Sequence, residues 1–522
     1  MPIDSLIFQI RQQFGFKPTA DQEHAICEFA SFIADSSPSA LMILRGSAGT
    51  GKTSLASAIV QTLVKWGKKV VLLAPTGRAA KVFELNSGHP AFTIHRKIYR
   101  QQSLMGDFNL NDNLHSNTLF LVDEASMIAN SAPTLSPFRR EGAASPTGNG
   151  LEGAFFGSGN LLDDLVSYVY NGRDCRLMLI GDHAQLPPVG MDESPALDAE
   201  WMRGYGLIVH EADLNEVLRQ SQESGILMNA NAIRQMITHD EMTQLPRIRF
   251  QGFADLRIVR GDELIESISS SYSRVGIDET MIVTRSNKRA NAYNMGIRNT
   301  ILGREDMLCM GDQLLIVKNN YYWLTQDNPP TTDNQPSPPL QRERLRVGES
   351  YSGMVGKGLP SLSFIANGDC ARVQRVRHVR ELYGFNFADV SLLLPDYDNL
   401  ELQATVVLDT LTAEAPALTR EQSDLLYNNV MEDYIDIPSK AARLKRLRED
   451  PYFNALQIKY AYAVTCHKAQ GGQWSHVYID QGYMTDDMLT PDYIHWLYTA
   501  FTRATETLFL VNWPANMIVD ER

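Results

Sequence analysis

The sequence is poor in cysteine and in long apolar runs, and it has no excess of positive charge. Five cysteines stand among 522 residues without a Cys-x-x-Cys pair, which argues against a disulfide framework or a zinc ribbon. No stretch approaches the roughly 18 apolar residues that cross a bilayer, and Met1–Phe16 lacks the apolar core of a signal peptide. We therefore expect a cytoplasmic protein with reduced thiols and no membrane partner.

Acidic residues outnumber basic ones, with 61 Asp and Glu against 48 Lys and Arg, so the formal net charge is −13. This balance argues against a protein that coats nucleic acid by bulk charge, but it leaves a local basic groove open. With 44% apolar and 21% charged residues, the composition is that of ordinary globular proteins and excludes a mostly disordered chain. At roughly 150 residues per domain, the length predicts about three to four domains.

Short apolar runs alternate with a helical pattern in the first part of the chain. Strands are expected at Leu41–Leu44, Val70–Leu73, Thr118–Val122 and Leu177–Ile180, and a helix at Thr53–Trp66. Alternation of this kind predicts a parallel sheet that is covered by helices on both faces.

The same alternation of strands and helices returns later in the chain, where a region with a different residue pattern interrupts it. Strands are expected at Met281–Thr284, Ala461–Thr465, Val477–Ile479 and Leu508–Val511. Between them, the runs Val390–Leu394 and Ala404–Leu408 predict a small β module, and Arg420–Tyr434 and Ser439–Arg448 predict helices. We expect an α/β protein with a first domain at 1–213, a second at 214–335 and 455–522, and an inserted β-barrel-like module with helices at 340–454. Two long segments, 136–160 and 326–340, have the composition of flexible surface loops.

The strongest motif is Gly46-Ser-Ala-Gly-Thr-Gly-Lys52-Thr53, which fits the phosphate-binding loop G-x-x-x-x-G-K-[ST]. A predicted strand precedes it and a predicted helix follows it, as this motif requires. Lys52 is expected to reach the β- and γ-phosphates of ATP, and the Thr53 hydroxyl to bind Mg²⁺. The residues expected to hold the nucleotide are Gly46, Ser47, Ala48, Gly49, Thr50, Gly51, Lys52 and Thr53.

Polar residues follow two further predicted strands. Asp123 and Glu124 end an apolar run, where Asp123 is expected to hold Mg²⁺ through water and Glu124 to deprotonate the attacking water. Gln185 lies just after the next strand. Because ligands bind at the carboxyl edge of parallel strands, Gln185 is placed to sense the γ-phosphate.

Six segments, taken in order, resemble the motif set of superfamily-one DNA helicases, and the RecD, Dda and Pif branch is the most similar. They are Gly46–Thr53, Asp123–Ser126, Gly181–Val189, Leu214–Gln220, Ala461–Gly472 and Tyr498–Ala504. The resemblance implies two RecA-like P-loop NTPase domains with ATP and Mg²⁺ in the cleft between them. It also implies that Gln22 reads adenine and that Arg219 and Arg503 reach the γ-phosphate as catalytic residues. Gln473 stands where many relatives carry Glu, which puts the ribose contact of that position in doubt.

The resemblance further implies a track for single-stranded DNA across both domains. Hydroxyl, imidazole and cationic groups suit phosphate contacts that do not specify sequence. The expected DNA-binding residues are Pro75, Thr76, Arg78, Phe92, Thr93, His95, Thr465, His467 and Lys468. Residues 97–117 are the segment in which a small hairpin pin that splits duplex is expected.

The sequence thus predicts an ATP-dependent helicase that moves 5′→3′ on single-stranded DNA and unwinds duplex. The direction rests on the resemblance alone. The expected partners are single-stranded DNA and single-strand/duplex junctions, the expected state is a monomer, and DNA repair and recombination are the expected processes. An alternative is a DNA-stimulated ATPase that clamps or remodels nucleic acid without opening it. A small-molecule kinase with the same phosphate loop is a third hypothesis, but it leaves Arg219, Gln470 and Arg503 without a role.

Overall fold

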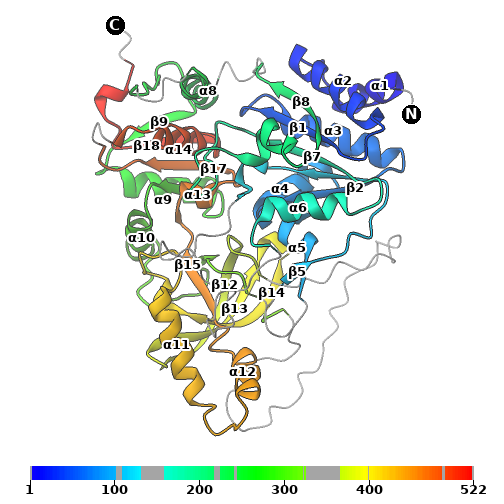
Figure 1. Cartoon of the computed structure of the whole chain (residues 1–522). Coiled ribbons are helices and arrows are strands. Elements are labelled where there is room, and N and C mark those ends of the chain that lie inside the picture. The colour runs from blue at the N-terminus through cyan, green and yellow to red at the C-terminus, as the bar shows by residue number, and fades with distance from the viewer. Residues whose placement is uncertain are drawn as a thin grey trace, which may run out of the picture.

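The computed structural model describes residues 3–101, 108–130, 158–216, 224–239, 244–320, 322–324, 365–397, 399–484 and 488–519. Two parallel sheets and a closed β-barrel make up the fold, and Figure 1 shows the barrel below the two sheet domains. The expected α/β class with a small β module is confirmed. No helix in these ranges is both long enough and apolar enough to cross a membrane.

The first domain is built on a six-stranded parallel sheet with the order β3-β2-β6-β7-β1-β8. Its strands are β1 (Ala40–Gly46), β2 (Lys69–Ala74), β3 (Ala91–Thr93), β6 (Thr118–Val122), β7 (Arg176–Gly181) and β8 (Ile208–Leu214). Its helices are α1 (Ile3–Phe14), α2 (Ala20–Ala34), α3 (Lys52–Lys65), α4 (Gly77–Ser87), α5 (Ile94–Ile98), α6 (Leu161–Tyr170) and α7 (Ala199–Arg203).

Side chains of the central strands alternate between two cores, as the period of two in a strand requires. In β1, Met42 and Leu44 pack with α1, α2 and α3, whereas Leu41 and Ile43 pack with α5, α6 and α7. Both faces of the sheet are therefore buried, and the carboxyl ends of the strands are left to carry polar loops. A short antiparallel pair, β4 (Tyr99–Gln101) with β5 (Phe108–Leu110), lies in the segment where the pin is expected. The turn between these two strands lies outside the described residues.

The second domain is built on a five-stranded parallel sheet with the order β16-β10-β17-β18-β9. Its strands are β9 (Leu256–Val259), β10 (Thr280–Thr284), β16 (Ala463–Thr465), β17 (Trp474–Asp480) and β18 (Ala504–Val511). Its helices are α8 (Gly225–Thr238), α9 (Leu264–Arg274), α10 (Asn287–Gly296), α13 (Cys466–Ala469) and α14 (Pro491–Phe501).

Five strands close the barrel in the order β11-β12-β13-β14-β15. They are β11 (Gln313–Ile316), β12 (Cys370–Leu382), β13 (Phe385–Leu394), β14 (Leu400–Val407) and β15 (Leu456–Tyr460), and α11 (Arg420–Glu432) and α12 (Lys440–Arg448) follow β14. Strands β11 and β15 lie outside the range 340–454 that was expected for the inserted module. They pair with each other across a long stretch of chain, and local sequence patterns carry no signal for such pairing. Most of the expected loops at 136–160 and 326–340 lies outside the described residues.

A buried charged cluster joins the barrel to the second domain. Asp312, just before β11, accepts hydrogen bonds from Arg298 (3.1 and 3.0 Å) and from the Tyr462 hydroxyl (2.7 Å). Arg298 and Asp312 are almost fully buried. Removing one partner of such a pair leaves an uncompensated charge, so the cluster fixes the barrel against the sheet.

Candidate nucleotide site and nucleic-acid groove

The phosphate loop connects the end of β1 to the start of α3. Gly49 and Gly51 have φ angles of 77° and 81°, in the left-handed region that favours glycine. Lys52 Nζ donates to the carbonyl oxygens of Gly46 (2.6 Å) and Ser47 (3.0 Å). The ammonium group is thus held at the loop, where a phosphate-binding loop places its lysine.

The two expected carboxylates follow β6 directly. Burial, and after it the neighbouring Glu124 carboxylate, raises the pKa of Asp123 to about 7, while the hydrogen bond from Glu124 N and the charge of Lys52 oppose the shift. Glu124 has a φ angle of 52°, which is uncommon for a residue with a side chain. Such backbone strain clusters at functional sites. The charge of Lys52 acts on the Asp123 carboxyl, so the carboxylates and the phosphate-loop lysine lie near one another.

Three buried polar atoms from the nucleotide-binding motifs lack a hydrogen-bond partner in the described part of the chain. They are Ser47 Oγ in the phosphate loop, Ser126 Oγ after the carboxylates, and Gln185 Oε1 after β7. Leaving a buried polar atom unpaired costs about 1–3 kcal/mol, so these atoms fit a site that is completed by a polar ligand. Described residues contain no group of three His, Cys, Asp or Glu arranged for a metal. A magnesium ion here therefore needs ligands beyond Thr53 and Asp123, such as phosphate oxygens and water.

Gln22 is fully buried at the start of α2 and contacts the phosphate loop. Its Oε1 accepts from Thr19 N (3.0 Å) in a capping box, and its Nε2 donates to the carbonyl of Thr50 (2.8 Å). Both ends of the amide are engaged by the protein itself. The structure thus gives Gln22 a role in positioning the loop, and the reading of adenine stays a prediction.

Helix α14 of the second domain packs on the loop that carries Gln185. The Tyr498 hydroxyl donates to Asp182 Oδ2 (2.5 Å) and accepts from Ala48 N of the phosphate loop (3.0 Å). Thr499 Oγ1 accepts from Leu186 N (2.8 Å). One helix therefore contacts both the phosphate loop and the segment expected to sense the γ-phosphate.

Of the two expected arginines, the structure describes only Arg503. Arg503 is almost fully buried and donates to the carbonyls of Thr499 (3.0 Å) and Gly472 (3.2 Å) and to the Thr502 hydroxyl (2.9 Å). Within the described ranges its hydrogen bonds go only to the second domain. Arg219 lies outside the described residues. The catalytic roles of both stay predictions.

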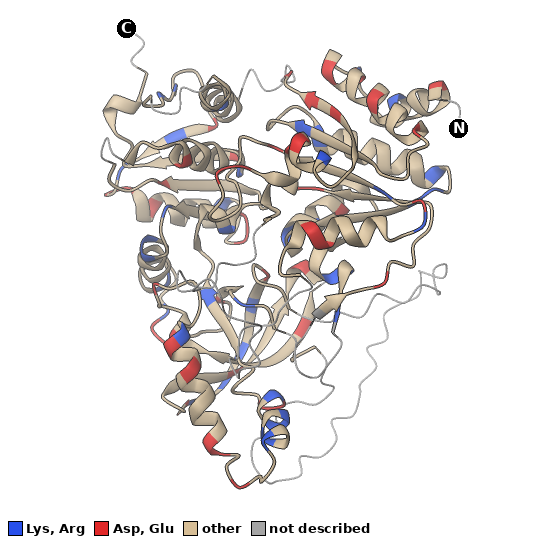
Figure 2. Ribbon diagram, viewed as in Figure 1, with Lys and Arg blue, Asp and Glu red and all other residues tan. Residues whose placement is uncertain are grey.

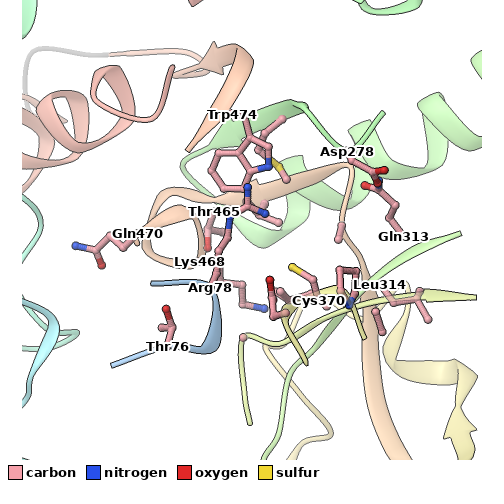
Figure 3. A pocket seen from close by; sticks show the side chains of 18 of the residues that line it. Thr76, Arg78, Asp278, Gln313, Leu314, Cys370, Thr465, Lys468, Gln470 and Trp474 are labelled. Carbon is pink, nitrogen blue, oxygen red and sulfur yellow. The ribbon is translucent and has the colours of Figure 1, made fainter. Parts of the chain in front are cut away.

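A cavity of about 1050 Å³ lies where both sheet domains meet the barrel. Figure 3 shows side chains from all three parts around it: Thr76 and Arg78 come from the first domain, Thr465 and Lys468 from the second, and Cys370 from the barrel. Five Lys and Arg line it against three Asp and Glu, although the chain as a whole is acidic. This cavity has the local positive charge that phosphate binding needs.

Five of the nine expected DNA-binding residues line the cavity and four do not. Those that line it are Thr76, Arg78, Thr465, His467 and Lys468, and those that do not are Pro75, Phe92, Thr93 and His95.

The structure shows the local surroundings of three of the four residues that lie outside the cavity. Thr93 accepts from Arg96 N and caps α5. The Phe92 ring lies 5.7 Å from the charged group of Lys97. Desolvation lowers the pKa of His95 to about 4, so its ring is neutral at pH 7.

Two residues connect the cavity to the contact between the domains. Gln470, which lines the cavity, donates to the carbonyl of Leu186 (2.7 Å), next to Gln185. Arg78 donates to the carbonyl of Gln473 (2.8 Å), and its guanidinium lies 4.1 Å from the centroid of the Trp474 ring. Residues that line the cavity therefore also take part in the contact between the two domains, next to the loop that carries Gln185.

Comparison with known proteins agrees with this arrangement. Residues 18–134 match the model of an AAA domain family, and residues 460–511 match the UvrD-like helicase C-terminal domain. The first range holds the phosphate loop and both carboxylates, and the second holds α13, α14 and Arg503. Both matches support the resemblance to the RecD/Pif-like superfamily-one helicases.

The individual proteins that this chain resembles are distant in sequence. The ATP-dependent RecD2 DNA helicase of Deinococcus radiodurans is 29% identical over 150 residues, which is 28% of this chain and 16% of that protein. An uncharacterised protein of Acanthamoeba polyphaga mimivirus is 22% identical over 525 residues, covering 90% of this chain and 94% of the relative. A crystal structure of Pif1 helicase from Bacteroides, in complex with ADP-AlF3 and single-stranded DNA, is 15% identical with a TM-score of 0.43. It covers 97% of this chain and 95% of the Pif1 chain.

Sequence reasoning gave no role to Tyr498, Asp182 and Thr499. All three lie within the recognised motifs, but the spacing of the motifs does not indicate which side chains cross between the domains. Only the packing of α14 on the first domain brings the Tyr498 hydroxyl to two of its loops.

Removing the Tyr498 hydroxyl should weaken the link between the two domains. A hydrogen bond to a charged group is worth about 1.5–3 kcal/mol, so Tyr498→Phe should lower the DNA-stimulated ATPase kcat roughly tenfold and leave folding intact. The matched control is Tyr493→Phe, because Tyr493 lies on the same helix but donates to Gln481 within the second domain (2.6 Å). Equal loss in both variants, or none in Tyr498→Phe, would contradict the assigned contact.

DNA binding should depend on the charge of Lys468. Desolvation, and after it the nearby Lys459 ammonium, lowers the pKa of Lys468 to about 8. The charged form exists below this pH and is lost above it, so affinity for an oligothymidine should fall roughly five- to tenfold between pH 7 and pH 9. Lys468→Arg should remove most of this slope, since arginine stays charged, whereas Lys459→Arg should keep it. Fluorescence anisotropy measures the slope, and an unchanged slope in Lys468→Arg would exclude this lysine from binding.

Proposed function

We propose that this protein is an ATP-driven DNA helicase that moves 5′→3′ along single-stranded DNA and unwinds duplex ahead of it. The observation that carries the proposal is the contact of α14 and Gln470 with the loop around Gln185. Its hydrogen bonds link the loop that carries Gln185 both to the α14 helix that contacts the phosphate loop and to Gln470 in the wall of the basic cavity, which supports a γ-phosphate sensor at Gln185. Binding or loss of the γ-phosphate at Gln185 then alters the contact that also forms a wall of the cavity.

The chemistry proposed for the nucleotide site needs little beyond positive charge and one base. Lys52 binds the β- and γ-phosphates, and Glu124 accepts the proton of the attacking water. Thr53 and Asp123 would hold Mg²⁺, which neutralises charge on the phosphate oxygens when it is bound. The unpaired Ser47 Oγ, Ser126 Oγ and Gln185 Oε1 supply polar atoms for the nucleotide and its hydration shell.

A second candidate function is a DNA-stimulated ATPase that clamps or remodels nucleic acid without opening it. The pair β4–β5 favours unwinding, because a hairpin beside the first domain is suited to separating the strands of a duplex. The direction of movement rests on the resemblance to the RecD, Dda and Pif branch. We further propose that the protein acts as a cytoplasmic monomer at single-strand/duplex junctions, in repair or recombination.

Strand displacement with tailed duplexes tests the unwinding activity. With ATP and Mg²⁺, a labelled strand should be released from a duplex with a 5′ single-stranded tail and not from one with a 3′ tail. Lys52→Ala should abolish release, because the phosphates lose their main cation. Release from the 3′ tail alone would refute the direction. ATPase stimulated by single-stranded DNA without any release would favour the clamp.

Changing Glu124 to Gln should separate nucleotide binding from turnover. The amide keeps the shape of the side chain but cannot accept a proton, so we expect ATP binding near the wild-type level and hydrolysis slowed by several orders of magnitude. Binding of a fluorescent ATP analogue and single-turnover kinetics measure the two steps. Wild-type turnover in this variant would remove Glu124 from the mechanism.

A further inference from the structure

Strand β12 of the barrel carries an unusual number of basic residues for this acidic chain. Four arginines and one histidine stand in its thirteen residues, against a single glutamate. Figure 2 shows blue segments on the strands of the barrel, below the two sheet domains. Neither the nucleotide chemistry nor the expected DNA-binding residues make use of this strand.

A β-bulge places three of these arginines on one face. The register of β12 against β13 shifts between Val373 and Arg375, so that one extra residue lies between them. Without that shift, Arg372 and Arg375 would point to opposite faces, because they are three positions apart. Ala371 and Val373 are buried in the core of the barrel, which leaves Arg372, Arg375 and Arg377 on its outer face.

The outer arginines differ in their partners. Arg372 pairs with Asp278 of the second domain. Arg375 and Arg377 are exposed, and neither forms an ion pair with a residue that the structure describes. Arg377 lies opposite Asp389, but that carboxylate already accepts from Arg380 and from the Thr405 hydroxyl. Two cationic side chains therefore face solvent without a neutralising partner among the residues that the structure describes.

This face continues the wall of the cavity. Arg372 and Leu393 are paired across β12 and β13, and both line the cavity. The next outward pair along the strands is Arg375 with Ser391. Successive outward positions on a strand are roughly 7 Å apart, so Arg375 and Arg377 extend the line of positive charge away from the cavity.

We propose that single-stranded DNA leaving the cavity continues over the outer face of β12, where Arg375 and Arg377 bind its phosphates. The inference rests on the proposed function, since it needs single-stranded DNA in the cavity. The guanidinium group of arginine can donate two hydrogen bonds to phosphate oxygens, and such contacts do not depend on the base sequence. This is expected for a protein that moves along a strand of any sequence. The barrel then belongs to the DNA-binding site.

Anisotropy with a short and a long oligothymidine, of about six and sixteen nucleotides, tests the extended site. Arg375→Ala combined with Arg377→Ala should weaken binding of the long oligonucleotide and leave the short one at wild-type affinity. Each lost phosphate contact on a single strand lowers the slope of log affinity against log salt by about 0.7, so the slope for the long one should fall by about 1.4. The matched control is Arg257→Ala combined with Arg260→Ala, which removes two exposed arginines in and just after β9, away from the barrel (Figure 1).

An unchanged slope for the long oligonucleotide in the β12 variant would overturn the inference. So would an equal loss in the β9 control, which would indicate a general effect of charge. If the wild-type protein bound the short oligonucleotide and the β12 variant behaved as wild type, the proposed function would stand without the extended site. If the wild-type protein bound neither oligonucleotide, both would fail.

Discussion

The contact between helix α14 and the loop around Gln185 is the interaction on which the other functional elements depend. Tyr498, Thr499 and Gln470 reach across from the second domain and bind Asp182 and Leu186. Because these bonds surround Gln185, the first domain cannot move its expected γ-phosphate sensor without disturbing the second domain. The same contact borders the basic cavity, so the proposed nucleotide site and the proposed nucleic-acid groove lie on opposite sides of one interface.

Much of the fold follows from local sequence. Runs such as Leu41–Leu44 and Leu119–Val122 are apolar throughout because helices cover both faces of each sheet, and this pattern is visible without any tertiary information. The closure of the barrel is not visible in this way, since β11 pairs with β15 far along the chain. The phosphate loop and its carboxylates are likewise local motifs. The role of the Tyr498 hydroxyl depends on packing between domains, which no local pattern encodes.

The net negative charge of the chain does not extend to the cavity that is proposed to bind nucleic acid. The cavity collects Arg78, Lys468 and other cations against a net charge of −13, and β12 extends this local excess. Desolvation, and after it the nearby Lys459 ammonium, lowers the pKa of Lys468, so keeping that side chain charged in the cavity has an energetic cost. Under the proposed function, the phosphates of bound nucleic acid would offset that cost. An acidic exterior limits non-specific coating of duplex and keeps binding short-ranged.

The central claim is that the nucleotide site and the nucleic-acid cavity share one interface, and thermodynamic linkage tests it most directly. The affinity for an oligothymidine should be measured with and without a non-hydrolysable ATP analogue, and the affinity for the analogue with and without the oligothymidine. The account predicts that both affinities change by the same factor, about fivefold or more. Affinities that are independent of the other ligand would contradict it.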